Sequence, residues 1–338
     1  MKKSTIAGTE QTESLHLVDY LYDYIGADLE RVRGAIDRAY DVQGDLMRDV
    51  AAYVRQGRGK MLRPALVCLA ARAHGYDADR EDGHIALAAA IELFHVATLL
   101  HDDVIDKAPL RRGRETVNAK WGDDVAILMA DFLYATSFDL ALSTLNPATL
   151  RLLAQTTQKM TEGEMLQIER RGDWLTVDDY MTIIERKTAI LFSAASGLGA
   201  MIAGAEYEDV ERAAQYGLSF GMAYQITDDT LDYEAQTDNW GKRVGADLKE
   251  GKQTLPLLQT LAVADAPDRE ALRAVLGNGR DFATVQGYVH KYKAIDTSLE
   301  VAADFSTQAI AALEDFPPSN RAAQIMRKLV DEILVRQH

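Results

Sequence analysis

Two related stretches decide the fold: Leu99-Leu100-His101-Asp102-Asp103-Val104-Ile105-Asp106 and Gln225-Ile226-Thr227-Asp228-Asp229-Thr230-Leu231-Asp232. Each is apolar and helical in pattern, and each ends in aspartates at i, i+1 and i+4, so at least two carboxylates project from one helix face. A lone Asp pair is best interpreted as a solvated helix end or an N-cap. Because the group occurs twice, we predict two helices that present carboxylates to a shared cavity, where oxygen ligands hold Mg²⁺ together with substrate phosphates.

Basic residues follow both acidic groups along the chain. Arg111-Arg112-Gly113 comes soon after the first, and a Gly-rich loop with Lys242 and Lys252 comes after the second. Guanidinium forks and ammonium groups suit phosphate oxygens. Each loop alone also fits an ordinary solvated turn, but the combination of chelating carboxylates with these cations indicates a magnesium-diphosphate site.

Two further basic stretches lie elsewhere. Gly57-Arg58-Gly59-Lys60 precedes a predicted helix with Pro64 in its first turn, an arrangement that suits an anion. Lys187 is expected in mid-helix between apolar segments and is predicted to point into a mostly buried space, with a snorkelling lysine as the plain alternative.

Composition narrows the class of protein. The 338 residues are 47% hydrophobic, enough for a large core in one domain or two. A net charge of −15 argues against nucleic acid or an anionic membrane as the main partner. Cys68 is the only cysteine and lies in an apolar run, so we expect a buried thiol, no disulfide and a cytoplasmic protein.

The chain ends and the apolar runs predict no signal and no membrane span. Residues 1–14 are polar and are expected to form a disordered lead-in. The longest uncharged run, Ile190 to Ala205, is shorter than the roughly 20 residues that cross a bilayer. It is rich in Gly, Ala and Ser, which favours a buried helix in close contact with its neighbours.

Apolar residues recur at i, i+3, i+4 and i+7 between the few prolines, and no strand pattern competes. We therefore predict a large all-α bundle. The expected helices cover roughly 15–40, 44–56, 62–75, 83–106, 121–144, 148–170, 176–203, 207–235, 253–263, 268–277, 282–292, 296–315 and 319–336.

With these motifs in order, the chain resembles the trans-isoprenyl diphosphate synthases, also called polyprenyl synthetases. The motifs that carry the resemblance are Gly59-Lys60-x-x-Arg63-Pro64, His95, Asp102-Asp103-x-x-Asp106, Arg111-Arg112-Gly113, Lys187-Thr188, Gln225-x-x-Asp228-Asp229-x-x-Asp232, Gly241-Lys242 and Gly251-Lys252-x-Thr254-Leu255-Pro256. One departure is that Arg58-Gly59 stands where the family usually has Gly-Gly, which puts the shape of that loop in doubt.

The resemblance implies a fold and a reaction. Residues 15–338 would form a single all-α bundle of the isoprenoid synthase type around a central cavity, as a homodimer. The reaction would condense isopentenyl diphosphate with an allylic diphosphate, with Mg²⁺, in three ions, as cofactor.

The resemblance also implies residue roles. Metal ligands would be Asp102, Asp103, Asp106, Asp228, Asp229 and Asp232. Isopentenyl diphosphate would be held by Lys60, Arg63, His95 and Arg112, and the allylic diphosphate by Arg111, Lys187, Thr188, Gln225, Lys242 and Lys252. The catalytic set would be Asp102, Asp103, Asp106, Lys187, Gln225 and Asp228.

Two rival functions remain open. A class I terpene cyclase also ionises prenyl diphosphates, but its second motif requires Ser or Thr where Asp232 stands and Glu where Gln236 stands. A non-catalytic subunit of a synthase is the other alternative, although intact aspartates and cations argue against it.

The helix of the first acidic group also bears on product length. Thr98, Ala97 and Phe94 lie one to two turns before Asp102, at about 5.4 Å per turn, and are expected to line the space below the reacting carbon. Synthases of this family that stop at farnesyl typically carry a bulky aromatic there, whereas Ala97 and Thr98 are small. Phe94, Phe132 and Phe138 are candidates for closing the tunnel deeper, with core packing as the plain alternative. We expect a long-chain all-trans product of the quinone-tail type, with geranylgeranyl diphosphate as the shorter alternative.

Overall fold

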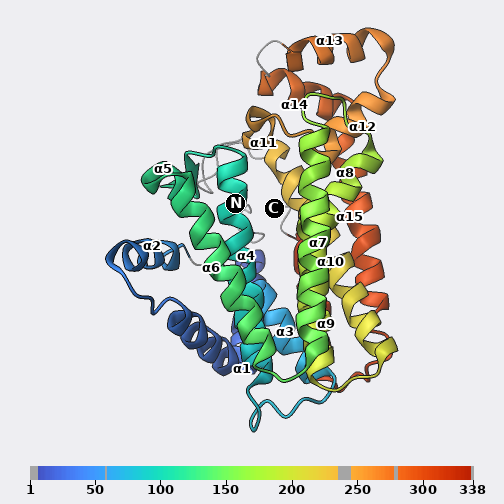
Figure 1. The fold of residues 1–338 in the computed structure, drawn as a ribbon. Coiled ribbons are helices and arrows are strands. Elements are labelled where there is room, and N and C mark those ends of the chain that lie inside the picture. Colours follow the sequence, from blue (N-terminus) through green and yellow to red (C-terminus); the bar gives the residue numbers. More distant parts are fainter. Residues whose placement is uncertain (1–6, 58, 235–244, 278–280, 336–338) are drawn as a thin grey trace.

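The computed structural model describes residues 7–57, 59–234, 245–277 and 281–335, and helices dominate these ranges (Figure 1). In chain order the first half contains α1 (Ala7–Ala39), α2 (Asp45–Arg55), α3 (Leu62–Ala73), α4 (Gly83–Ile105), β1 (Leu110–Arg111), β2 (Arg114–Glu115), α5 (Val117–Trp121), α6 (Asp123–Leu142) and α7 (Pro147–Glu169). The second half contains α8 (Val177–Ile184), the π-helix η1 (Glu185–Ala189), α9 (Ile190–Ile202), α10 (Tyr207–Glu234), α11 (Ala246–Glu250), α12 (Leu255–Val263), α13 (Ala266–Gly277), α14 (Phe282–Lys291), α15 (Ala294–Ala311) and α16 (Arg321–Val335). The predicted all-α fold is confirmed.

The core is built around α9, which packs against α3 on one side and α10 on the other. Small residues allow this close approach: a Cβ on Gly199 would lie 2.4 Å from the backbone oxygen of Val67, and one on Gly217 would lie 2.2 Å from that of Phe192. Because protein interiors are close-packed, larger residues at these glycines would force the helices apart. The run after Ile190 is therefore the buried helix that its composition predicts.

Helices α4 and α10 carry the two acidic groups at their C-terminal ends. Both helices run in the same sense in Figure 1, so the two ends lie toward the same end of the molecule. Most of α4 is buried, including Leu93, Phe94 and Ala97, and its last turns carry His101, Asp102 and Asp103.

Three predictions about local structure are corrected by the model. The first helix begins at Ala7 rather than near residue 15, although the division of the chain at residue 14 itself stays a prediction. The expected helix 176–203 contains a π-helical turn, Glu185–Ala189. A short hairpin, β1–β2, pairs Leu110 with Glu115 where no strand was expected. Its turn residues Arg112 and Gly113 both have positive φ, 51° and 75°, as a tight two-residue hairpin turn requires.

Among the residues that the structure describes, two helices, α4 and α6, are long and apolar enough to cross a membrane by length and composition alone. In α4, 72% of the most apolar window is buried inside the molecule, as in the core helix of a globular bundle. In α6 only 33% of that window is buried. Much of the apolar surface of α6 is therefore exposed in the single chain.

Candidate active site

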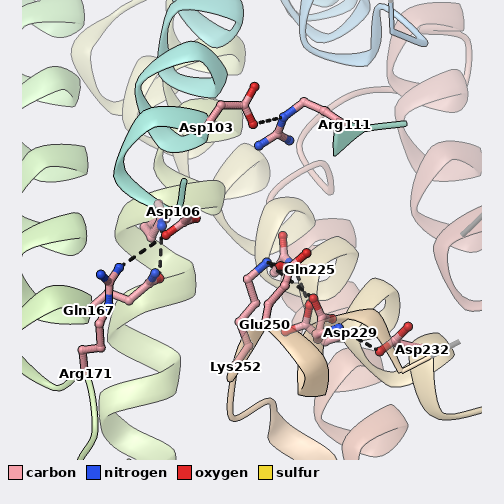
Figure 2. Close-up of polar contacts among 12 residues, drawn as sticks. Asp103, Asp106, Arg111, Gln167, Arg171, Gln225, Asp229, Asp232, Glu250 and Lys252 are labelled. Carbon is pink, nitrogen blue, oxygen red and sulfur yellow. Dashed lines mark hydrogen bonds and ion pairs between the residues drawn. The ribbon is translucent and has the colours of Figure 1, made fainter. Parts of the chain in front are cut away.

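The first acidic group lies at the end of α4 and is already paired with cations. Asp103 is buried and accepts a hydrogen bond of 2.7 Å from Arg111 Nε, while Asp106 Oδ1 lies 3.4 Å from Arg171 Nη2 (Figure 2). The hairpin β1–β2 holds Arg111 beside Asp103. Sequence reasoning did not include Arg171, which belongs to no motif and follows the end of α7.

Burial raises the pKa of Asp102 to about 6, although the nearby Lys187 acts against this shift. Burial also raises the pKa of Asp103, against the effect of Arg111. Carboxylates with raised pKa values in a partly buried site carry negative charge that the surroundings do not fully compensate. A divalent cation would stabilise that charge.

The second acidic group lies at the end of α10. Asp229 is buried and accepts two hydrogen bonds, from Tyr180 Oη at 2.7 Å and from Gln225 Nε2 at 2.6 Å. Burial and then the charge of Asp247 raise the pKa of Asp229 to about 7. Asp228 and Asp232 are half-buried, and Asp232 Oδ2 accepts a hydrogen bond of 3.3 Å from the backbone N–H of Asp247.

The π-helix η1 connects the two acidic groups. Lys187 donates to Gln167 Oε1 at 3.0 Å, forms an ion pair with Glu164, and favours the ionised form of Asp102. Thr188 Oγ1 donates to Gln225 Oε1 at 3.0 Å, and Gln225 in turn contacts Asp229. Single π-helical turns occur frequently at functional sites.

Close packing of α7 on η1 makes these contacts possible. A Cβ on Gly163 would lie 2.6 Å from Arg186 Cβ, so this glycine lets α7 approach the π-helix closely. As a result Lys187 is partly buried, with 19% of its side chain exposed, as the sequence predicts.

A second group of cations surrounds the start of α3. The Arg63 guanidinium lies 4.2 Å from the centre of the Phe192 ring, and burial lowers its pKa to about 10 although Glu92 opposes the shift. Burial and the charges of Arg63 and Arg112 lower the pKa of His95 well below its usual value, so this imidazole is neutral at pH 7. Lys60 lies in the loop between α2 and α3, just before the start of α3.

Gly59 lies close to side chains of this group of residues. A Cβ built on Gly59 would lie 3.6 Å from Arg112 Nη1 and 3.9 Å from Glu92 Oε1. Of the sequence-predicted residues, Arg63 and Arg112 thus share a buried glutamate, Glu92, that sequence reasoning missed. A single Glu in an apolar helix carries no motif, and only its burial beside two arginines identifies it.

Lys252 follows the end of α11, and Figure 2 shows its side chain near Glu250. Its Nζ is 2.8 Å from Glu250 and 3.5 Å from Asp247. Burial lowers the pKa of Lys252, but Asp247 and Glu250 act more strongly together and raise it, so the side chain stays protonated. Lys242 and Gly241 lie outside the described residues, as does Arg58.

Within the ranges that the model describes, no three His, Cys, Asp or Glu side chains already form a metal-binding group. The donor set nevertheless fits Mg²⁺, which prefers a few carboxylates and keeps several of its waters. Arg111 and Lys187 neutralise part of the acidic charge.

The residues that the sequence predicts to set product length lie on α4 and α6. Phe94 and Ala97 are fully buried, and Thr98 Oγ1 donates to the backbone oxygen of His95 at 2.7 Å. Phe132 and Phe138 are half-buried on α6.

Tyr134 is an aromatic residue beside this set that sequence reasoning missed. Its ring lies 5.0 Å from that of Phe94, 5.5 Å from that of His101 and 6.4 Å from that of Phe138. The spacing of Tyr134 and Phe138 by one helical turn is the signal that was available in the sequence.

Comparison with known proteins identifies the family of this chain. Residues 44–293 match the family model described as polyprenyl synthetase. Octaprenyl diphosphate synthase of Escherichia coli (strain K12) is 36% identical over 294 residues, which cover 86% of this chain and 90% of that protein. An all-trans-nonaprenyl-diphosphate synthase (geranyl-diphosphate specific) of Rhodobacter capsulatus is 38% identical over 279 residues, covering 81% of this chain and 84% of the relative.

The fold also resembles that of a solved polyprenyl synthase structure. The polyprenyl synthase of Caulobacter crescentus CB15, complexed with calcium and isoprenyl diphosphate, superposes with a TM-score of 0.87 at 36% identity and covers 95% of this chain and 98% of its own. The predicted resemblance and the predicted class of enzyme are confirmed. The chain therefore belongs to the polyprenyl synthetase family and is a trans-prenyltransferase.

Proposed function

We propose that this enzyme extends an allylic diphosphate with isopentenyl diphosphate and releases a long-chain all-trans polyprenyl diphosphate. One observation supports the reaction: Lys187 of η1 favours the ionised form of Asp102 on α4, and Thr188 of η1 donates to Gln225 on α10, so one turn interacts with both acidic helices. The long product is supported by the octaprenyl and nonaprenyl synthases among its relatives and by the small Ala97 and Thr98.

Asp102, Asp103, Asp106 and Asp228 would hold Mg²⁺, in three ions by resemblance to the family. When bound, the metal supplies Lewis-acid stabilisation of the diphosphate leaving group. Around it, Arg111, Lys187, Lys252 and Lys242 would bind the allylic diphosphate, with Thr188 and Gln225 next to them. Their positive charge favours departure of the diphosphate as the allylic C–O bond breaks.

Lys60, Arg63, Arg112 and the neutral His95 would bind isopentenyl diphosphate on the other side. The double bond of this substrate attacks the allylic cation, a C–C bond forms, and a proton passes to the departed diphosphate. The protein lowers the activation barrier of the condensation by holding the two diphosphate substrates in a fixed orientation, because this replaces a bimolecular encounter. No side-chain nucleophile is required.

We also propose that the active form is a homodimer in which a second copy covers α6. Leu128 and Leu142 lie on one face of this helix and are 66% and 51% exposed, and Leu145 beyond its end is 89% exposed. Apolar residues at helical spacing on an otherwise charged surface are typical of an interface. A cytoplasmic location is proposed from the lone buried thiol of Cys68.

The test is an assay of the isolated protein with labelled isopentenyl diphosphate and farnesyl diphosphate. Reverse-phase analysis of the dephosphorylated product is expected to give chains well beyond geranylgeranyl. Geranylgeranyl as the end product would overturn the proposed length. A hydrocarbon would instead indicate a cyclase, and absence of turnover a non-catalytic subunit.

A further inference from the structure

The neighbouring aspartates of the second acidic group lie in different surroundings. Successive residues of an α-helix are rotated by about 100°, so Asp228 and Asp229 point in different directions. Asp228 is half-buried, whereas Asp229 is only 6% exposed. The two side chains therefore differ in how easily a hydrated ion reaches them.

Both oxygens of Asp229 already have protein donors. Oδ2 accepts from Tyr180 Oη at 2.7 Å and Oδ1 accepts from Gln225 Nε2 at 2.6 Å. Mg²⁺ requires near-octahedral geometry and gives up its waters reluctantly. A carboxylate that is enclosed and engaged on both oxygens is a poor ligand for such an ion.

These contacts have a second consequence, because they fix the amide of Gln225. Its Nε2 donates to Asp229, so its Oε1 is turned toward Thr188, from which it accepts a hydrogen bond of 3.0 Å. Tyr180 lies on α8, just before η1, and Thr188 lies within η1. The π-helical turn is thus tied to α10 at two points on either side of Lys187.

We propose that Asp229 is a positioning residue and not a metal ligand: together with Tyr180 it orients Gln225 and, through Thr188, holds the π-helical turn that carries Lys187. This inference rests on the proposed function, in which Lys187 binds the allylic diphosphate. In the second acidic group, Asp228 would then hold the metal, whereas Asp229 organises the turn that would bind the diphosphate.

The metal side of the proposal is tested by Mn²⁺ binding, measured by electron paramagnetic resonance in the presence of inorganic diphosphate. Asp229→Asn and Tyr180→Phe are expected to bind as many ions as the wild type, with Kd values within about threefold. Asp228→Asn is expected to lose at least one ion.

Loss of an ion in Asp229→Asn would overturn the inference. If both Asp228→Asn and Asp229→Asn retain every ion, the positioning role of Asp229 stands and the ligand set of the proposed function is wrong. The two failures are therefore distinguishable.

The positioning side is tested by kinetics, with a matched control. Tyr180→Phe is expected to raise KM for the allylic diphosphate by about five- to tenfold and to change KM for isopentenyl diphosphate by less than about twofold. Tyr216→Phe is the control, because Tyr216 is also buried and its hydroxyl donates to the Met326 backbone oxygen at 2.9 Å, away from the site.

The control loses a comparable hydrogen bond without touching η1, so both KM values are expected to stay unchanged. An equal effect of Tyr180→Phe on the two substrates, or no more effect than Tyr216→Phe, would show a merely structural role and overturn the proposal. Thermal unfolding of both variants checks that each remains folded.

Discussion

Asp102 and Asp228 are the residues on which the proposed chemistry depends most. Each comes from a different helix, so removal of either carboxylate is expected to disable the shared metal site. Asp102→Ala and Asp228→Ala should each lower turnover by roughly 10²- to 10³-fold, the scale of losing one electrostatic stabiliser of a leaving group. Steady-state kinetics measure this, and unchanged circular dichroism shows that the fold is intact. Near-normal turnover in either folded variant contradicts the shared site.

Lys60 and Lys187 are the residues that test the proposed division into two substrate sites. Lys60→Ala is expected to raise KM for isopentenyl diphosphate about tenfold, with a smaller effect on the allylic substrate, because a charge-assisted hydrogen bond to phosphate is lost. Lys187→Ala is expected to do the reverse. Equal effects on both substrates would mean that the residue roles taken from the family are assigned incorrectly.

Asp28 gives a pH-dependent prediction far from the site. It is 1% exposed, and Arg72 Nε donates to its Oδ2 at 2.7 Å. Burial raises the pKa of Asp28, but His84 and Arg72 outweigh it and the net pKa is lowered. A lowered pKa stabilises the fold above the unfolded value of about 3.9, and this contribution disappears as the pH falls through the lower, folded-state pKa.

Asp28→Asn is therefore expected to reduce the free energy of unfolding by about 2 kcal/mol at pH 7, since Arg72 loses its buried partner but keeps some contact with solvent. The difference from the wild type should shrink below about pH 4. Urea unfolding at several pH values measures it. Asp45→Asn, which removes the exposed ion pair with Arg48, is the control, with a change below about 0.5 kcal/mol. A difference that persists at low pH would exclude the charge as its cause.

Single residues also show where sequence reasoning stops. The aspartates, Lys60, Arg63 and Lys187 were predictable because each belongs to a pattern that chemistry explains. Tyr180, Glu92 and Tyr134 were not, because each acts through a contact between helices that are distant in sequence. Such contacts exist only once the bundle has formed.

At the level of helices, we expect the residues of α4 and α6 below Asp102 to limit how far the product grows. Ala97→Phe is expected to shorten the product, because a ring one turn below Asp102 overlaps the path of the growing tail. Tyr134→Ala is expected to lengthen it, since Tyr134 packs on Phe94. Ala154→Phe, on the exposed face of α7, is the control. Chromatography of the dephosphorylated products measures chain length, and an unchanged distribution in Ala97→Phe would refute this assignment.

The long helices were the most predictable elements. The pattern over 207–235 corresponds closely to α10, and that over 83–106 to α4. The π-helical turn and the hairpin were missed for different reasons. A π-turn depends on contacts with α7 and α10 rather than on its own residues, and Arg112-Gly113 lacks the Asn-Gly signal usual for a two-residue hairpin turn.

For the whole molecule, the exposed face of α6 makes assembly testable. Leu128→Asp is expected to convert a dimer into monomers, because a buried charge at an apolar interface is costly. Light scattering after size-exclusion chromatography measures the mass. Val263→Asp is the control, since Val263 is 63% exposed on α12. A monomeric wild-type protein would contradict the proposed homodimer. A dimer that Leu128→Asp leaves intact would show that the interface does not involve this face of α6.

The burial of Cys68 in α3, beside the tightly packed α9, has a practical consequence. Burial raises the pKa of this thiol, so in the native state it is both shielded from reagents and poor in thiolate. A thiol-specific dye can label it only during moments when α3 separates from the core. Since this chain has no other cysteine, the labelling rate reports how often the core around α3 opens. Bound diphosphate should lower this rate if the ligand holds the surrounding helices together.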